Sequence, residues 1–222
     1  MPSSYSDQLS KIAAQAIEQL GSRHQAREQA LAVSREVIRF SANAIRAVHR
    51  AEFDEARRLI EQGGARLKET RPIRENNPEI YYAGFLSDAR KEFTEANVTL
   101  AVVSGAEIPS PEDLDVDPPA FLNGLAEVIG ELRRNILDML RHDEFDRCEE
   151  FMDVMDEIYG ILVTVDFPEG VTGGLRRSTD AMRGVLERTR GDLTLALRQR
   201  KLELKLAAWE ERQPAVNPSA NP

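Results

Sequence analysis

Glycine and proline gather at a few places in this chain, and the segments between these places are mostly long and rich in Ala, Leu, Glu and Arg. Residues of these four types have high helix propensity. No window shows the sustained polar–apolar alternation of a strand, so no sheet is predicted. The breaks instead delimit six helical segments: 4–49 (with a candidate break at Gly21-Ser22), 53–70, 78–104, 120–140, 145–163 and 172–211.

These segments predict an all-α protein. Helices joined mostly by short connectors pack as antiparallel neighbours, so we expect an antiparallel bundle of about six to seven helices. The chain fits a single domain, expected over residues 1–212, with a Pro- and acid-rich connector at 106–119 and a disordered tail at 213–222. The first segment carries one apolar arc of about 100° at helical spacing: Ala30, Val33, Val37, Phe40, Ala44, Val48 and Ala51.

Composition restricts the cellular compartment and the classes of partner that are expected for this protein. A single cysteine, Cys148, cannot form an internal disulfide, which favours the reducing cytoplasm. No apolar run reaches the roughly 18 residues that cross a bilayer, and the N-terminus does not resemble a signal peptide, so no membrane partner is expected. The formal net charge of -9 argues weakly against a nucleic-acid partner, but it does not say where the charges lie.

Two segments carry three carboxylates each at spacings that place them on one helical face: Asp88, Glu92 and Glu95 in one, and Glu150, Asp153 and Glu157 in the other. Neighbouring carboxylates repel one another unless a cation lies between them, and Mg²⁺ is a hard cation that prefers oxygen ligands. If the two faces meet, they form a metal pocket. The alternative is that each is an acidic face in contact with solvent.

The first segment also carries a basic stripe of Arg35, Arg39, Arg46 and Arg50, which fall within an arc of about 60° on the helical wheel. Such a stripe fits a phosphate backbone, for which Arg is well suited. Ion pairing with the many acidic residues is the alternative.

Several other kinds of site are excluded by the motifs that they require. The three histidines lie outside any Glu-x-x-His pair of a di-iron bundle. Asp113, Asp115 and Asp117 begin like a calcium loop, but Pro118 stands where glycine is needed. There is also no zinc-type Cys/His cluster, no phosphate-binding glycine loop and no nucleophile elbow.

Four stretches, in order along the chain, resemble conserved blocks of the translin family and in particular of its member Trax: SREVIRFS at 34–41 closing with HR at 49–50, EFTEA at 92–96, FLNGLAEVIGELRR at 121–134, and FMDVMDEIY at 151–159. The similarity extends from about residue 27 to residue 200. Glu92 and Glu95 match two acidic positions of Trax that translin itself lacks. Counting from the shared Phe of the fourth block places Glu157 on the third catalytic carboxylate, an Asp in Trax.

The resemblance implies an all-α, prokaryotic or archaeal Trax-like protein of the kind that assembles into hollow, usually octameric barrels. It implies binding of single-stranded RNA or DNA and Mg²⁺-dependent endoribonuclease activity, with Mn²⁺ as a second candidate metal. The catalytic residues implied are Glu92, Glu95 and Glu157, and the further candidate metal ligands are Asp153, Glu127 and Asp88. The arginine stripe and Arg134 are the expected nucleic-acid contacts, and a homo-oligomer is the simplest assembly.

Three other functions compete with this prediction. One is a translin-type nucleic-acid-binding protein without catalysis. Another is an all-α nucleoside triphosphate pyrophosphohydrolase. Enzymes of that class have paired acidic motifs, and Glu92-x-x-Glu95 and Glu150-x-x-Asp153 of this chain resemble them. The third is a helical scaffold without chemistry, in which the acidic faces are only solvated surface.

Overall fold

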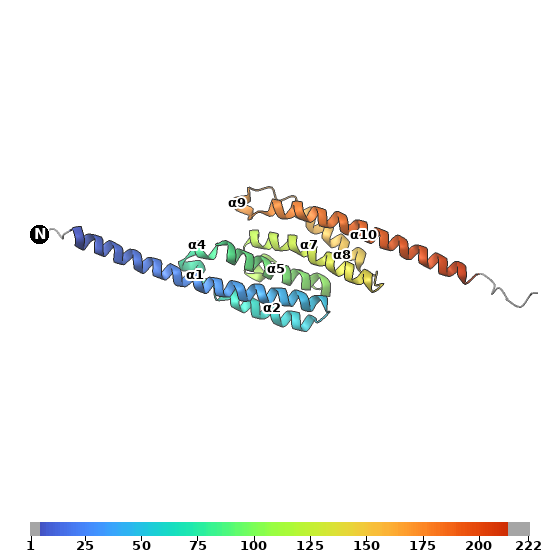
Figure 1. Cartoon of the computed structure of the whole chain (residues 1–222), viewed down its shortest axis with the longest axis horizontal. Helices are drawn as coiled ribbons and strands as arrows, with labels where there is room; N and C mark the ends of the chain where they lie inside the picture. Colours follow the sequence, from blue (N-terminus) through green and yellow to red (C-terminus); the bar gives the residue numbers. More distant parts are fainter. Residues whose placement is uncertain (1–4, 213–222) are drawn as a thin grey trace, which may run out of the picture.

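The computed structural model describes residues 5–212 and contains ten helices and no strand within that range. The all-α prediction is therefore confirmed. The tail predicted at 213–222 lies outside the described residues. The helices, labelled in Figure 1, are α1 (Tyr5–His49), α2 (Phe53–Lys68), α3 (Arg71–Asn76), α4 (Pro78–Tyr81), α5 (Gly84–Ser104), α6 (Pro111–Leu114), α7 (Pro118–Arg141), α8 (Cys148–Leu162), α9 (Glu169–Thr172) and α10 (Leu175–Glu210).

The boundaries depart from the prediction in two instructive places. Helix α1 continues without interruption through Gly21, because a single glycine in a long helix costs only about 1 kcal/mol. The segment expected at 78–104 is instead two helices, since the chain turns at Tyr82 and Ala83 before α5 begins.

The bundle consists of two groups of three helices. Helices α1, α2 and α5 pack against one another, as do α7, α8 and α10, and the α5–α7 contact joins the two groups. The largest apolar core runs along this junction, from Val48 of α1 and Val98 of α5 to Ile129 of α7 and Met155 of α8. The arc predicted on α1 forms part of the core, except that Phe40 is half-buried and that Ala51, two residues past the end of α1, has a positive φ of 58° and is exposed.

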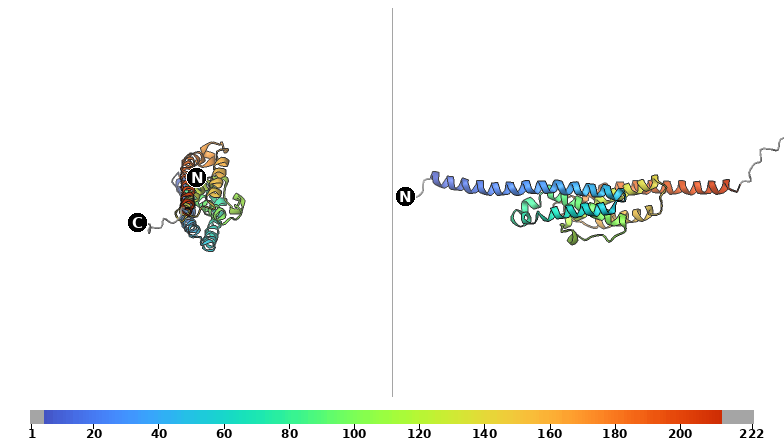
Figure 2. Two further views of the ribbon diagram at one scale, coloured as in Figure 1. Left: turned by 90° about the vertical axis from the view of Figure 1, so that its right-hand side faces the viewer. Right: turned by 90° about the horizontal axis from the view of Figure 1, so that it is seen from below.

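Two long helices extend beyond the bundle in opposite directions. The N-terminal half of α1 and the C-terminal part of α10 project from opposite ends, so the two ends of the chain lie far apart (Figures 1 and 2). Both projections carry exposed large apolar side chains: Tyr5, Leu9, Ile12, Ile17 and Leu20 on α1, and Leu202, Leu204, Leu206 and Trp209 on α10. Within residues 5–212, no helix combines the length and apolarity needed to cross a membrane.

A buried arginine ties the start of α7 to α5. Arg90 of α5 is 1% exposed, and its guanidinium lies 2.7 Å from a carboxylate oxygen of Asp117, which precedes α7. The same guanidinium donates a hydrogen bond to the carbonyl oxygen of Tyr81 and stacks 4.3 Å from its ring centre. A buried charge is tolerated only when it is paired in this way. The pairing holds the N-terminal part of α7 beside α5.

Candidate metal centre

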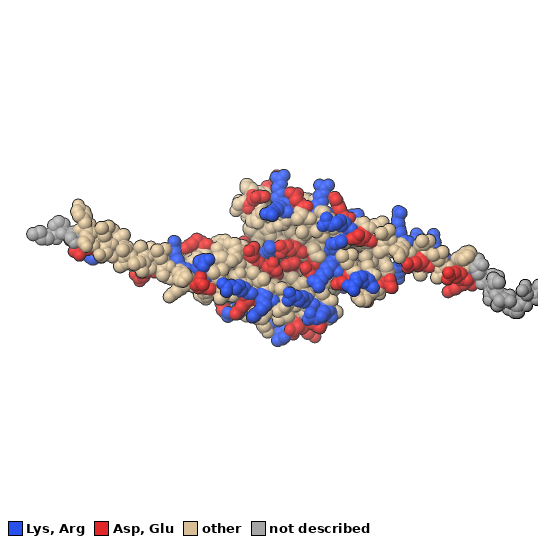
Figure 3. Space-filling model, viewed as in Figure 1, with Lys and Arg blue, Asp and Glu red and all other residues tan. Residues whose placement is uncertain are grey.

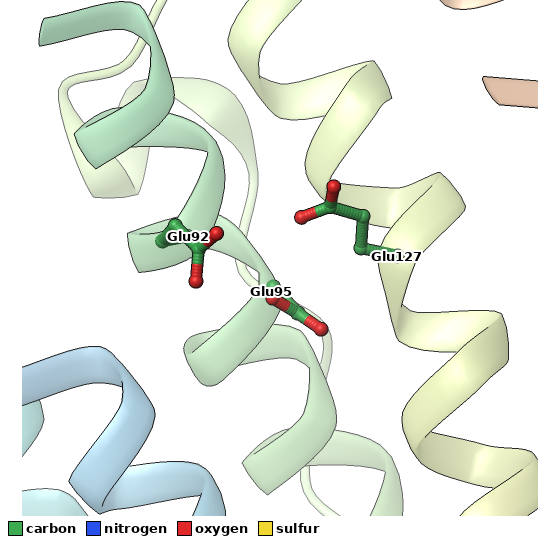
Figure 4. A group of neighbouring side chains, drawn as sticks. All are labelled: Glu92, Glu95 and Glu127. Carbon is green, nitrogen blue, oxygen red and sulfur yellow. The ribbon is translucent and has the colours of Figure 1, made fainter. Parts of the chain in front are cut away.

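Three glutamates meet where α5 faces α7. Glu92 and Glu95 come from consecutive turns of α5, and Glu127 extends from α7 toward them (Figure 4). Each offers a carboxylate oxygen, and these oxygens all lie within 4.8 Å of one another. Glu95 is buried, while Glu92 and Glu127 are half-buried. We call Glu92, Glu95 and Glu127 the carboxylate group.

A glycine allows the two helices to come this close. A Cβ atom added at Gly124, on α7, would lie 2.6 Å from the Cβ of Thr94 and 2.8 Å from the carbonyl oxygen of Lys91. Both distances are shorter than van der Waals contact, so no other residue fits here without moving α5. Glu127 follows Gly124 by three residues, about one helical turn, and therefore points into the same contact.

Burial and the charges of neighbouring carboxylates make Glu92 and Glu95 hard to ionise. Burial raises the pKa of Glu95 to about 8, and the charges of Glu127, Glu92 and Glu131 add to this effect. Burial also raises the pKa of Glu92, with Glu127 contributing again. Three carboxylate oxygens at this spacing suit a hard divalent cation such as Mg²⁺, which would remove the repulsion. The donor set therefore fits the metal that the sequence analysis predicts.

The raised pKa of Glu95 gives the metal-free protein a specific pH dependence. Between the ordinary value of 4.5 and about 8, the folded protein binds more protons than the unfolded chain. Its free energy of unfolding should therefore fall as the pH rises through this window, by about 2–4 kcal/mol from this residue, and change no further above it. Thermal denaturation in chelator at pH 5.5 and pH 8.5 measures the effect. The Glu95→Gln variant should show a clearly smaller fall, and equal falls in the two proteins would contradict the assignment.

A histidine that the sequence analysis did not select lies beside the carboxylate group. The imidazole Nε2 of His49, at the end of α1, donates a hydrogen bond to Glu131 of α7, and the His49 side chain is only 5% exposed. Glu131 follows Glu127 by one turn, and its charge acts on both Glu92 and Glu95. The i, i+4 spacing of Glu127 and Glu131 is the sequence signal that would have identified Glu131 as a neighbour of the centre.

Comparisons with known proteins agree with this architecture. No family model matches the chain. An uncharacterized protein of Methanocaldococcus jannaschii, MJ0175, is 32% identical over 188 residues, which cover 84% of this chain and 83% of the relative. The structure of AfC3PO in complex with duplex RNA has a TM-score of 0.79 and 35% identity, covering 85% of this chain and 97% of that one. A crystal structure of AfC3PO alone gives 0.78 and 34%, over 85% of this chain and 98% of that one. The chain is a Trax-like, archaeal-type member of the translin family. The crystal structure of apo-NeC3PO, at 17% identity and a TM-score of 0.74 over 83% of this chain and 96% of that one, shares the fold.

In this translin-family chain, one residue expected at the centre lies elsewhere in the structure. Glu157 does not join Glu92 and Glu95, because it is exposed on α8, which packs against α7 and α10. The expected convergence of Glu157 with them is therefore wrong, and Glu127 takes the third place. Asp153 is likewise exposed on α8. Asp88 is exposed one turn before Glu92, close enough for its charge to raise the pKa of Glu92.

The arginine stripe lies on the exposed side of α1. All four of its members, Arg35, Arg39, Arg46 and Arg50, are exposed, and so is Arg134 on α7. Arg50 pairs with Glu52, at 2.6 Å, so for this residue the ion-pairing alternative holds in part. In Figure 3, acidic side chains form a patch over α5 and α7, and basic side chains border it along α1. Arg46 precedes His49 by three residues, about one helical turn, so this part of the stripe lies near the end of α1 that carries His49.

Proposed function

We propose that this translin-family protein binds RNA and cleaves single strands with a divalent metal held by Glu92, Glu95 and Glu127. The observation that carries the proposal is the convergence of three carboxylates, one with a pKa of about 8, beside a basic border. The similar protein AfC3PO forms a complex with duplex RNA, which supports a nucleic-acid partner for this chain. Mg²⁺ is the expected metal, with Mn²⁺ as the second candidate.

The chain's own residues divide the work between binding and reaction. The carboxylate group holds the metal at the α5–α7 contact, and the arginines of α1 place the phosphate backbone alongside it. When bound, the divalent ion would polarise a phosphodiester and lower the pKa of an attacking water. The direct test incubates labelled single-stranded RNA, duplex RNA and single-stranded DNA with the protein in Mg²⁺ or in chelator. Cleavage of single-stranded RNA in Mg²⁺ alone supports the proposal, and binding without cleavage favours the non-catalytic alternative.

The pyrophosphohydrolase alternative receives less support from the geometry. Its two acidic motifs would have to face each other across one site. Here Glu150 of α8 pairs with Arg147, which immediately precedes that helix and lies 2.9 Å away, and Asp153 is exposed. The carboxylate that faces Glu92 and Glu95 comes from α7 instead.

Binding should depend on the arginine stripe and on salt. Replacing Arg35 and Arg39 with glutamine removes two phosphate contacts, so the slope of log affinity against log salt should flatten by about 1.4 for a single strand. Fluorescence anisotropy with labelled RNA from 50 to 300 mM salt measures the slope. Arg57 and Arg58 of α2 pair with acids on their own helix, and their double glutamine variant is the matched control. Equal slopes in all three proteins would show that Arg35 and Arg39 do not contact phosphates.

The projecting ends of α1 and α10 should form contacts between copies of the chain. Apart from Leu204, their exposed apolar residues recur at helical spacing, which favours burial against another helix, and we propose a homo-oligomer, with an octamer as the expected size. Light scattering should give a mass near eight times 24.9 kDa. Leu9→Glu combined with Leu202→Glu should reduce this mass without loss of helicity, since both residues are exposed in the single chain. A wild-type mass of 24.9 kDa would contradict the assembly.

A further inference from the structure

A lysine lies inside the otherwise acidic centre. The ammonium nitrogen Nζ of Lys91 lies 2.6 Å from the Oε1 atom of Glu127. Lys91 belongs to α5 and Glu127 to α7, so the ion pair bridges the two helices. Both side chains are partly buried, at 25% and 33% exposure, which screens the pair less than a pair on the open surface. In the metal-free protein, Lys91 is therefore the positive charge nearest to Glu127 in the carboxylate group.

This ammonium and a bound divalent cation would compete for the same carboxylate. Glu127 is one of the three residues whose oxygens converge, and it is the one that Lys91 holds. Two positive charges on one carboxylate repel each other strongly at the effective dielectric of a partly buried site. Loading of the centre is therefore easier when Lys91 moves away from Glu127.

A second position beside Asp88 is within reach of the Lys91 side chain. Its side chain also lines a pocket of about 300 Å³ between the N-terminal parts of α5, α7 and α10. Asp88 lines the same pocket, three residues before Lys91 on α5 and exposed. A lysine side chain has enough rotatable bonds to exchange Glu127 for Asp88 without a change in the backbone.

We propose that Lys91 is an internal counter-cation that holds Glu127 in the metal-free protein and leaves it when a divalent cation binds, so that residue 91 sets the metal affinity of the centre. The inference rests on the proposed function, because it assumes that the carboxylate group binds metal. It assigns Lys91 a positioning role and not a catalytic one.

The first experiment measures Mn²⁺ binding by electron paramagnetic resonance in the absence of RNA. Lys91→Gln should bind Mn²⁺ roughly tenfold or more tightly than the wild type, because the competing charge is gone. Lys91→Arg, which keeps the charge, should remain near the wild type. Lys68→Gln removes one exposed lysine charge outside the centre and should also remain near the wild type.

The second experiment uses the wild-type protein, so it does not depend on how the variants fold. Lysines are acetylated briefly with a limiting reagent, with and without Mg²⁺, and the product is quantified by mass spectrometry. Mg²⁺ should raise the modification of Lys91 severalfold relative to Lys68. Unchanged relative modification of Lys91 would overturn the release from Glu127.

The results distinguish failure of the role proposed for Lys91 from failure of the metal centre on which it rests. If the wild type and Glu95→Gln bind Mn²⁺ equally weakly, the metal centre itself is wrong. If Glu95→Gln loses the binding of the wild type while Lys91→Gln binds with unchanged affinity, the metal centre stands and the role of Lys91 is wrong. Equal tightening in Lys91→Gln and Lys68→Gln would likewise overturn it, because overall charge would then explain the effect.

Discussion

Replacing Glu95 with glutamine should reduce RNA cleavage by about a thousandfold while leaving RNA binding intact. The substitution keeps the shape of the side chain but removes a ligand charge at the most buried position of the carboxylate group. Loss of about 4 kcal/mol of stabilisation of the transition state by the metal corresponds to this factor. Single-turnover cleavage of a labelled single strand in saturating Mg²⁺ measures the rate, and anisotropy measures the affinity.

Two further variants decide which third carboxylate completes the centre. Glu127→Gln should lose activity as Glu95→Gln does, because its oxygens converge with those of Glu92 and Glu95. Glu157→Gln should cleave at nearly the wild-type rate, because Glu157 is exposed on α8. Full activity in Glu127→Gln together with loss in Glu157→Gln would show that the centre is assembled differently.

Gly124→Ala should damage both the fold and the centre. The new methyl group would meet Thr94 and the carbonyl oxygen of Lys91 at distances that real Cβ atoms do not tolerate. One of the two atoms is backbone, so rotation of a side chain cannot relieve the clash and α5 must move away from α7. Overpacking of this kind costs about 1–3 kcal/mol. The displacement should also weaken Mn²⁺ binding at least tenfold, since Glu127 moves with α7.

Urea denaturation and Mn²⁺ titration test the two effects of Gly124→Ala together. Gly130→Ala is the matched control, because a Cβ on this second glycine of α7 meets nothing within 4 Å. That variant should keep its metal affinity and match or slightly exceed the wild type in stability, since alanine is the better helix former. Thr94→Ala should not rescue Gly124→Ala, because the Cβ of residue 94 and the carbonyl of Lys91 remain. Wild-type stability and affinity in Gly124→Ala would contradict the close contact.

Local patterns were enough to predict the long helices and two of the three carboxylates of the centre. Helix formation depends on propensity and on apolar spacing over a few turns, so the six long segments could be read from the chain, although short helices such as α6 were missed. The pairing of Glu92 with Glu95 is equally local, since a spacing of three residues places two side chains on one face of any helix. The resemblance to Trax identified the same two residues.

The third carboxylate depended on packing that no local pattern contains. Glu127 and Glu157 both stand on helical faces with further acids nearby, and their spacing alone does not separate them. Gly124 makes the difference, because its missing side chain lets α7 approach α5, while α8 packs against α7 and α10. The same contact brings Lys91 onto Glu127. Which segments are helical and which residues share a face follow from the amino-acid sequence, because those properties extend over a few turns. Which faces meet follows from the packing of the helices, because that depends on contacts between residues far apart in the chain.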